Sequence, residues 1–234
     1  VGVRNQCGEK RESLQELLLF YSSTEKKLVT LREYADRMPE SQKYIYYAAG
    51  DTLEAIDSLP QTELLKERGM EILYCTDRAD EFLADSLRTY DGKEFRSAVD
   101  GDLGLEDEPK TQESESDKEC LAFIKETLGD RVDEVKASQK LKSHPVCMTS
   151  GEGLTFEMEK YFQAVQPELS MKAKRILEVN VAHPAFLKLE SVRATDPELA
   201  KKYAEVLYNQ ALLIAGLPLA DPSGYTDLVC SLWS

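Results

Sequence analysis

The stretch KYIYYAAGDT, residues 43–52, decides the fold class of the first half of the chain. Its run of aromatic and apolar residues predicts a buried strand, and the Gly-Asp-Thr that ends it predicts a turn in which Asp or Thr caps a helix. EILYCT, residues 71–76, repeats this pattern and leads into residues 80–90, whose apolar side chains recur at helical spacing. Two such units in succession predict parallel strands joined by crossover helices.

The sequence around these two units suggests where the domains lie. Before them, residues 14–20 are apolar at helical spacing and predict a short helix. After them, residues 101–118 are dominated by acidic and small polar side chains, with two leucines as the only large apolar ones. Such a segment cannot bury enough apolar surface to offset the entropy of ordering it, so we expect a linker between domains at 1–100 and 119–234.

The second half alternates predicted strands and helices, which indicates a further mixed α/β domain. Apolar, β-favouring runs predict strands, and apolar side chains at helical spacing predict helices. The strands are expected at residues 132–137, 146–149 and 175–179, and the helices at residues 120–128 and 154–165.

Two consecutive helices are predicted at the end of the chain. Asp196 and Asp221 each precede a proline, and an N-cap Asp before a Pro at the first helical position is a favoured helix start. The second helix places five apolar residues, including the only Trp, on one stripe. Burying that stripe would contribute roughly 7–15 kcal/mol of favourable free energy, whereas association costs about 4–15 kcal/mol of free energy.

One terminal helix is therefore marginal as an interface, and a lasting dimer needs both helices of each copy. This predicts a four-helix contact about a two-fold axis. Folding of the stripe back onto its own chain remains the alternative. The predicted interface residues are Leu199, Tyr203, Val206, Leu207, Leu213, Ile214, Tyr225, Leu228, Val229, Leu232 and Trp233.

The predicted helix over residues 154–165 carries a stripe of Met and aromatic side chains, while Phe156 lies off that stripe. Two glycines precede the helix and a proline follows it, so the segment has a flexible entry. A face of this composition is typical of adaptable binding surfaces. A core helix with one stray Phe explains the pattern equally well.

Charge and hydropathy bear on the class of partner. The chain has 43 acidic against 29 basic residues and a formal charge of −14, which disfavours nucleic acid and anionic membranes. There is no apolar run of about 18 residues that could span a bilayer, and the first ten residues have no leader pattern. We therefore expect an intracellular, soluble protein.

Signals for catalysis are weak. Five scattered cysteines and two histidines predict neither a disulfide framework nor a metal site. A Cys147–His144 pair is conceivable, but buried, inert cysteines are far commoner. Asp77, Asp80 or Cys75, near the end of a predicted strand, would serve a small α/β enzyme with a dimerisation module, although such carboxylates more often cap helices. The glycine motifs of nucleotide sites are missing from the sequence.

Long stretches of the chain closely resemble the heat shock protein 90 family of molecular chaperones, and in particular its bacterial form, high-temperature protein G. The match extends over essentially the whole chain, and no single short motif carries it. The matching stretches are LREYADRMPESQKYIYYAAGDT (31–52), LPQTELLKERGMEILYCTDRADEF (59–82), YDGKEF (90–95), SHPVCMTS (143–150), LEVNVAHPAFLKL (177–189) and QALLIAGLPLADP (210–222).

The resemblance implies a fold and a division of labour. In that family an ATPase domain, a middle domain and a C-terminal dimerisation domain follow one another. This chain looks like the end of the middle domain, a small α/β/α sandwich over 1–100, an acidic linker over 101–118, and the mixed α/β dimerisation domain over 119–234. The domain that binds ATP and Mg²⁺ has no counterpart here, so we expect no catalytic residues, no cofactor and no metal site.

The resemblance also implies partners and a cytoplasmic location. The family forms homodimers through its last two helices, which supports the four-helix prediction, and it binds unfolded or partly folded client proteins. The chain ends in CSLWS and not in the MEEVD that recruits co-chaperones in eukaryotic members, so that partnership is not implied. A purely structural dimeric adaptor remains an alternative.

The family's client-contacting helix aligns with the predicted helix over 154–165. The solvent-facing side of this helix would then carry Glu157, Glu159 and Lys160. A second client-contacting aromatic of bacterial members, on a middle-domain helix, corresponds to Phe82, although an ordinary core position explains Phe82 equally well. The client-binding residues that the resemblance implies are Leu154, Met158, Tyr161, Phe162 and Phe82.

Overall fold

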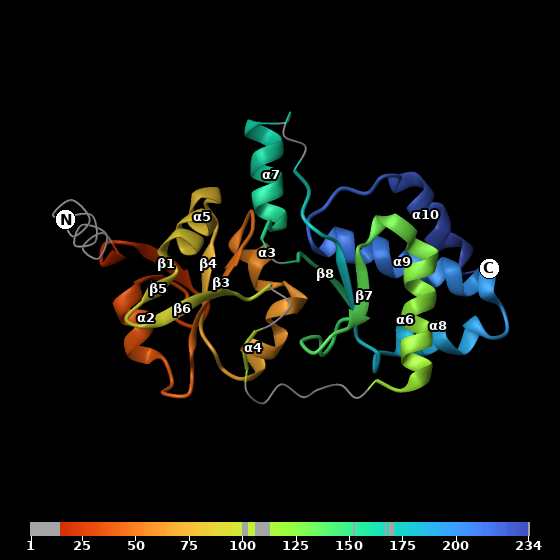
Figure 1. Cartoon of the computed structure of the whole chain (residues 1–234), viewed down its shortest axis with the longest axis horizontal. Helices are drawn as coiled ribbons and strands as arrows, with labels where there is room; N and C mark the ends of the chain where they lie inside the picture. The colour runs from red at the N-terminus through yellow and green to blue at the C-terminus, as the bar shows by residue number, and fades with distance from the viewer. Residues whose placement is uncertain are drawn as a thin grey trace, which may run out of the picture. The chain divides into compact units, whose positions relative to one another are not determined.

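The computed structural model of the chain describes residues 15–99, 103–105, 113–151, 153–166, 168 and 171–233 (Figure 1). These residues form two compact units. Unit 1 contains the described residues up to Ser58 and from Leu65 to Gly104, and unit 2 contains Leu59–Leu64 and the described residues from Leu105 onward. Each unit has its own β-sheet with helices around it, so the fold is mixed α/β.

Unit 1 is built on a six-stranded sheet. The two strands predicted from sequence are parallel neighbours, with Tyr46 opposite Ile72, which confirms the crossover arrangement. In spatial order the strands are β2 (Leu28–Thr30), β1 (Leu19–Ser22), β4 (Ile72–Cys75), β3 (Tyr44–Ala49), β6 (Lys93–Ser97) and β5 (Thr89–Tyr90).

Local capping fixes where the helices of unit 1 begin. Thr52 accepts a hydrogen bond from the backbone N–H of Ala55 at 3.1 Å, so the threonine of the Gly-Asp-Thr turn is the cap. Thr30 and Glu33 form a reciprocal capping box at the start of the preceding helix. The helices are α2 (Leu31–Arg37), α3 (Leu53–Asp57), α5 (Arg78–Leu87) and α4 (Glu63–Glu67), of which α4 begins in unit 2.

The helix predicted over residues 14–20 is wrong at its end, because only Gln15 of its described residues is helical and residues 16–18 lead into a strand. Leu19 and Phe20 open β1, in which Phe20 is buried beside Val29 while Leu19 is exposed. This alternation has the period of a strand, and a short apolar run does not distinguish a strand from a helix by spacing alone. Residue 14 lies outside the described residues.

The acidic segment 101–118 is anchored at both ends in the parts that the structure describes. Leu103 is fully buried in unit 1, and its carbonyl accepts a hydrogen bond from the Tyr46 hydroxyl at 2.8 Å. Gly104 follows with φ +65°, and a Cβ there would clash with the Tyr44 ring. At the other end Ser114 caps α6 (Glu115–Leu128), so residues 115–118 are helical and not part of a linker.

Unit 2 contains a three-stranded sheet in the order β7 (Glu134–Ala137), β9 (Ile176–Val179), β8 (Val146–Thr149). β7 is parallel to β9, and β8 is antiparallel to it. All three strands were predicted, as were α6 and the later helices α7 (Phe156–Val165), α9 (Pro197–Ile214) and α10 (Pro222–Ser231). Three further elements were not predicted from the sequence: α8 (Pro184–Arg193) and the 3-10 turns η1 (Pro60–Thr62) and η2 (Gly129–Arg131).

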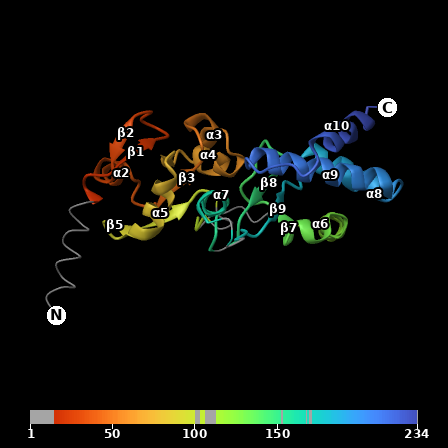
Figure 2. The same ribbon diagram turned by 90° about the horizontal axis from the view of Figure 1, so that it is seen from above.

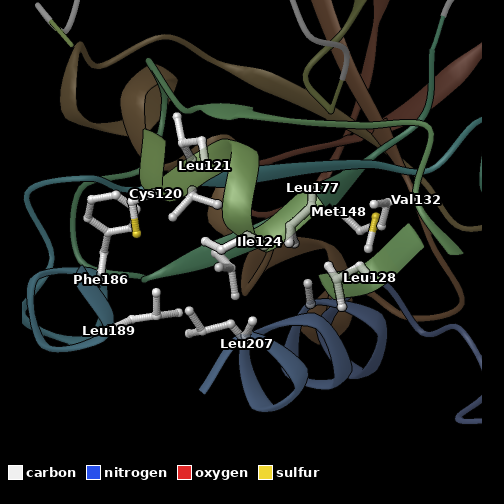
Figure 3. Close-up of a cluster of buried hydrophobic side chains, with 14 of the residues drawn as sticks. Cys120, Leu121, Ile124, Leu128, Val132, Met148, Leu177, Phe186, Leu189 and Leu207 are labelled. Atoms are coloured by element: carbon white, nitrogen blue, oxygen red, sulfur yellow. The ribbon is translucent and has the colours of Figure 1, made fainter. Parts of the chain in front are cut away.

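One face of this sheet forms the hydrophobic core of unit 2 (Figure 3). Leu177 and Met148 project from the sheet toward α6, where Ile124 lies at the centre of the cluster. Phe186 of α8 and Leu207 of α9 close the cluster from the other side. Because strand side chains alternate between faces, the residues between these must point away from the core.

The opposite face of the sheet is polar yet buried. Glu178 is 1% exposed and accepts hydrogen bonds from Ser138 at 2.9 Å and Thr149 at 3.2 Å. The Lys140 ammonium, also buried, lies 3.4 Å from the same carboxylate. A buried charge is tolerated only when it is paired and hydrogen-bonded, and Glu178 meets both conditions.

Residues 59–64 contribute to unit 2 although residues on either side of them belong to unit 1. The buried Gln61 donates a hydrogen bond to the carbonyl of Met148 at 2.9 Å. The Glu63 carboxylate accepts from the backbone N–H groups of Lys142 at 2.7 Å and Ser143 at 3.0 Å. The segment is therefore held by specific polar contacts with β8 and with the loop before it.

Candidate interaction surfaces

The two terminal helices begin where the sequence predicts. Asp196 accepts a hydrogen bond from the backbone N–H of Leu199 at 3.0 Å, and Asp221 accepts one from Gly224 at 2.9 Å. In both helices proline follows the capping Asp, and its ring fixes a helical backbone angle at a position that needs no N–H. These caps set the direction in which each apolar stripe faces.

The inner face of α9 belongs to the core of unit 2. Small side chains dominate it, which lets α9 lie close to α6 and α8 (Figures 1 and 2). Leu207, one of the predicted interface residues, is buried on this inner face. The buried residues of α9 are Ala200, Ala204, Leu207, Ala211 and Leu212.

Two large apolar side chains of the terminal helices are open to solvent. Leu213 is 52% exposed and Trp233, just after α10, is 82% exposed. Among the described residues of α10 none is buried, although the helix lies against α9, where the Lys202 ammonium is 3.4 Å from the Ser231 hydroxyl. Tyr203, another predicted interface residue, packs against the core of unit 2. The remaining predicted residues are partly exposed: Leu199, Val206, Ile214, Tyr225, Leu228, Val229 and Leu232.

Contiguous apolar surface of this kind usually marks a site of association. The five apolar residues of α10 and the two positions after it are all at least partly exposed, which is unusual for a stripe that serves only its own chain. The arrangement of α9 and α10 can therefore present a self-complementary patch to a second copy of the chain.

The helix α7 stands clear of α6 and α8 within unit 2 (Figure 1). Its first residue, Phe156, packs against the hydrophobic core, and Met158 is buried. Tyr161 and Phe162 are partly exposed and form an edge-to-face pair with ring centroids 5.7 Å apart. Leu154, which precedes the helix, is also partly exposed. The predicted client-binding stripe thus divides into a buried Met and an accessible aromatic pair.

Glu159 differs from the expectation that it lies on the solvent face of α7. It is only 4% exposed, and its carboxylate forms a two-pronged ion pair with Arg175, with N···O distances of 2.5 and 2.7 Å. The backbone N–H of Ala173 donates to the same carboxylate at 2.6 Å. Burial alone would raise the pKa of Glu159, but these hydrogen bonds outweigh it and leave the pKa below its usual value. Sequence reasoning missed Arg175 as a partner because it lies 16 positions along the chain.

Phe82 lies on α5 in unit 1 and is partly buried. It therefore belongs to a different unit from the α7 residues with which it was grouped. Its role in client binding stays a prediction.

The residues considered for catalysis lie in unreactive surroundings. Burial raises the pKa of the Cys75 and Cys147 thiols, which keeps both protonated. His144 lies beside Glu63, with Nδ1 2.6 Å from the carboxylate. Burial also raises the pKa of Asp80. Within the described ranges no three His, Cys, Asp or Glu side chains are grouped as metal ligands would be.

In the part of the chain that the structure describes, no helix combines the length and the apolar character needed to cross a bilayer.

Comparison with known proteins places the chain in a family. The model of the Hsp90 protein family matches residues 1–234. The chain is 48% identical over 234 residues to the chaperone protein HtpG of Oceanobacillus iheyensis, and 49% identical to proteins of the same name from Clostridium acetobutylicum and Alkaliphilus metalliredigens. At least 99% of this chain is covered, but only 37–38% of each relative, so it spans just over a third of their length. The chain belongs to the Hsp90 family of chaperones.

Proposed function

We propose that this chain is the part of an Hsp90-type chaperone that joins two copies together and contacts unfolded client proteins. The observation that carries the proposal is the open apolar surface of α9 and α10, where Leu213 is 52% and Trp233 is 82% exposed. Pairing these helices with their counterparts in a second chain would remove that surface from water in a four-helix contact.

The domain division follows from the same proposal. Residues 1–100 would be the end of the middle domain, the acidic segment from 101 up to the α6 cap at Ser114 the connection, and α6 onward the dimerisation domain. ATP binding and hydrolysis would belong to parts of the relatives that this chain does not span. The role of the paired chains is then tethering, which raises the effective concentration of whatever each copy carries. Such a chaperone would act on client proteins in the cytoplasm.

The dimer is tested by light scattering across a dilution series from about 100 to 1 µM, where marginal interfaces dissociate. We expect twice the chain mass of 26.4 kDa at the upper end. Deleting residues 221–234 should give monomers at every concentration. An unchanged dimer mass after that deletion would refute the interface. A monomeric parent chain would mean that the apolar stripe packs against its own chain.

The client role rests on the accessible aromatic pair of α7. Replacing Tyr161 and Phe162 with Ser should weaken suppression of aggregation of a thermally unfolding protein such as citrate synthase, while the dimer mass stays unchanged. Leu187→Ser on α8 is a matched control, because Leu187 is also an exposed apolar residue of unit 2. Retained suppression in the double variant would contradict the assignment. If the parent chain fails to bind any unfolded protein, a purely structural adaptor is the better description.

A further inference from the structure

The attachment of α7 to the rest of unit 2 depends on few contacts. Phe156 packs against the core at the first turn, and Met158 is buried just beyond it. From there on, the described contacts of the helix with other parts of unit 2 are mainly polar. Glu159 holds the end of the first turn, and the Lys160 ammonium lies beside Gly216, just after the end of α9.

Several hydrogen-bond donors surround the carboxylate of Glu159. Arg175 supplies two N–H groups in a fork, and the backbone of Ala173 supplies a third donor from the segment that leads into β9. Within α7, Gln163 donates to the other carboxylate oxygen at 3.0 Å. Arg175 is itself fixed, because its guanidinium lies 5.2 Å from the centre of the Phe156 ring and donates to the carbonyl of Ala173.

This arrangement has two consequences. A planar fork that meets a carboxylate with two hydrogen bonds defines orientation as well as distance, which a single point charge does not. Removing either partner leaves a mostly buried charge without its counter-ion, which is strongly unfavourable. The orientation of the helix, and with it the direction in which Tyr161 and Phe162 face, is thus coupled to one ion pair.

We infer that Glu159 and Arg175 are positioning residues for client binding: their ion pair holds α7 in one orientation so that the Tyr161–Phe162 pair is presented ready-made to a partner. This inference rests on the proposed client role of α7. Preorganisation raises affinity because the ordering entropy is not lost again on binding. Neither side chain needs to touch the client.

The experiment compares Glu159→Gln, Arg175→Met and Arg175→Lys in the whole chain. Amide hydrogen exchange reports the order of α7, with the amides of α6 and α9 as an internal reference for global folding. We expect α7 amides to exchange at least tenfold faster in Glu159→Gln and Arg175→Met, with α6 and α9 unchanged. Arg175→Lys, which keeps the charge but loses the fork, should fall between these variants and the parent.

The matched control is Glu205→Gln. It breaks another two-pronged Arg–Glu pair of unit 2, between Arg131 and Glu205 of α9, and leaves α7 untouched. The second readout is the dissociation constant for a permanently unfolded probe, reduced and carboxymethylated α-lactalbumin. We expect this constant to rise at least fivefold in Glu159→Gln and to stay unchanged in the control.

The outcomes separate the inference from the proposed function. Unchanged exchange of the α7 amides in both Glu159→Gln and Arg175→Met would overturn the inference. It would also be overturned if these variants exchange faster in α7 but bind the probe as the parent chain does, while Phe162→Ser weakens probe binding. If Phe162→Ser also leaves probe binding unaltered, the client role of α7 falls, while the anchoring of the helix by the ion pair stands. If the amides of Glu159→Gln lose protection throughout the chain, Arg175→Lys becomes the deciding variant. Its α7 amides must then exchange faster than its α9 amides.

Discussion

Trp233→Ala is the sharpest test of the dimer surface, because this side chain contributes little to its own unit. It is 82% exposed. An aromatic side chain has roughly 200 Å² to bury, so about 160 Å² of Trp233 remains open. If association covers only half of that area, the loss at about 25 cal/mol per Å² is about 2 kcal/mol for each chain.

The two-fold arrangement doubles this effect. Every interface residue occurs twice in a symmetric dimer, so Trp233→Ala should cost about 4 kcal/mol of association free energy, which is roughly a thousandfold rise in the dissociation constant. The free energy of unfolding of the monomer should change by less than about 0.5 kcal/mol, as is usual for exposed positions.

Two assays measure the prediction. Sedimentation velocity across a dilution series gives the dissociation constants of the parent chain and the variant, with Leu187→Ala on α8 as the exposed apolar control. Because Trp233 is the only Trp in the chain, its own fluorescence should shift to shorter wavelength as the parent chain associates. A dissociation constant unchanged within threefold, or an emission maximum that stays that of exposed Trp in the dimer, would refute the proposed interface.

Three further tests concern unit 2. In a chain whose Cys7 has been replaced by Ser, the exposed Cys230 should react with a thiol reagent, whereas the buried Cys147 should stay protected until the chain unfolds. Mass spectrometry of the labelled peptides measures both reactions. Glu63→Gln should lower the urea midpoint at pH 7. Burial would raise the pKa of Glu63, but hydrogen bonds outweigh it and hold the pKa at about 2, so the contribution of the carboxylate to stability is present above about pH 4.5 and is lost as the pH falls toward 2. The difference in urea midpoint between the variant and the parent chain should shrink over that range. A difference that persists at pH 2 would contradict this reasoning. Phe186→Ala should cost about 3–5 kcal/mol in the free energy of unfolding, since it removes a fully buried aromatic ring from the core of unit 2. A loss below about 1 kcal/mol in calorimetry would show that the core collapses around the site.

Sequence patterns were most informative where a strand is buried along most or all of its length or where helix capping is local. The strands at 44–49 and 72–75 and the caps Asp196 and Asp221 are set by neighbouring residues, and all were predicted. Leu19 and Phe20 were placed in a helix because a short apolar run fits either period until its partner strand is known. The missed α8 has apolar residues that are spread around the helix, so no clear stripe marks it.

The candidate surfaces show the same limit. The apolar stripe of α10 is visible in the sequence, since its residues are close neighbours along the chain. The burial of Glu159 is not, because a glutamate on a helix surface is ordinarily solvated, and its partners Ala173 and Arg175 come from a separate segment. Long-range pairing of this kind needs the tertiary structure.

The contribution of residues 59–64 to unit 2 also imposes an order on synthesis. Gln61 and Glu63 find their partners 79–87 positions later in the chain. At about 5–20 residues per second, translation of that stretch lasts roughly 4–17 s. During this interval the segment that will hydrogen-bond to Met148 has no acceptor there, although the sheet of unit 1 on either side of it is already complete in sequence. These hydrogen bonds of residues 59–64 can therefore form only after β8 has left the ribosome, and unit 2 produced from residue 105 onward would lack this segment.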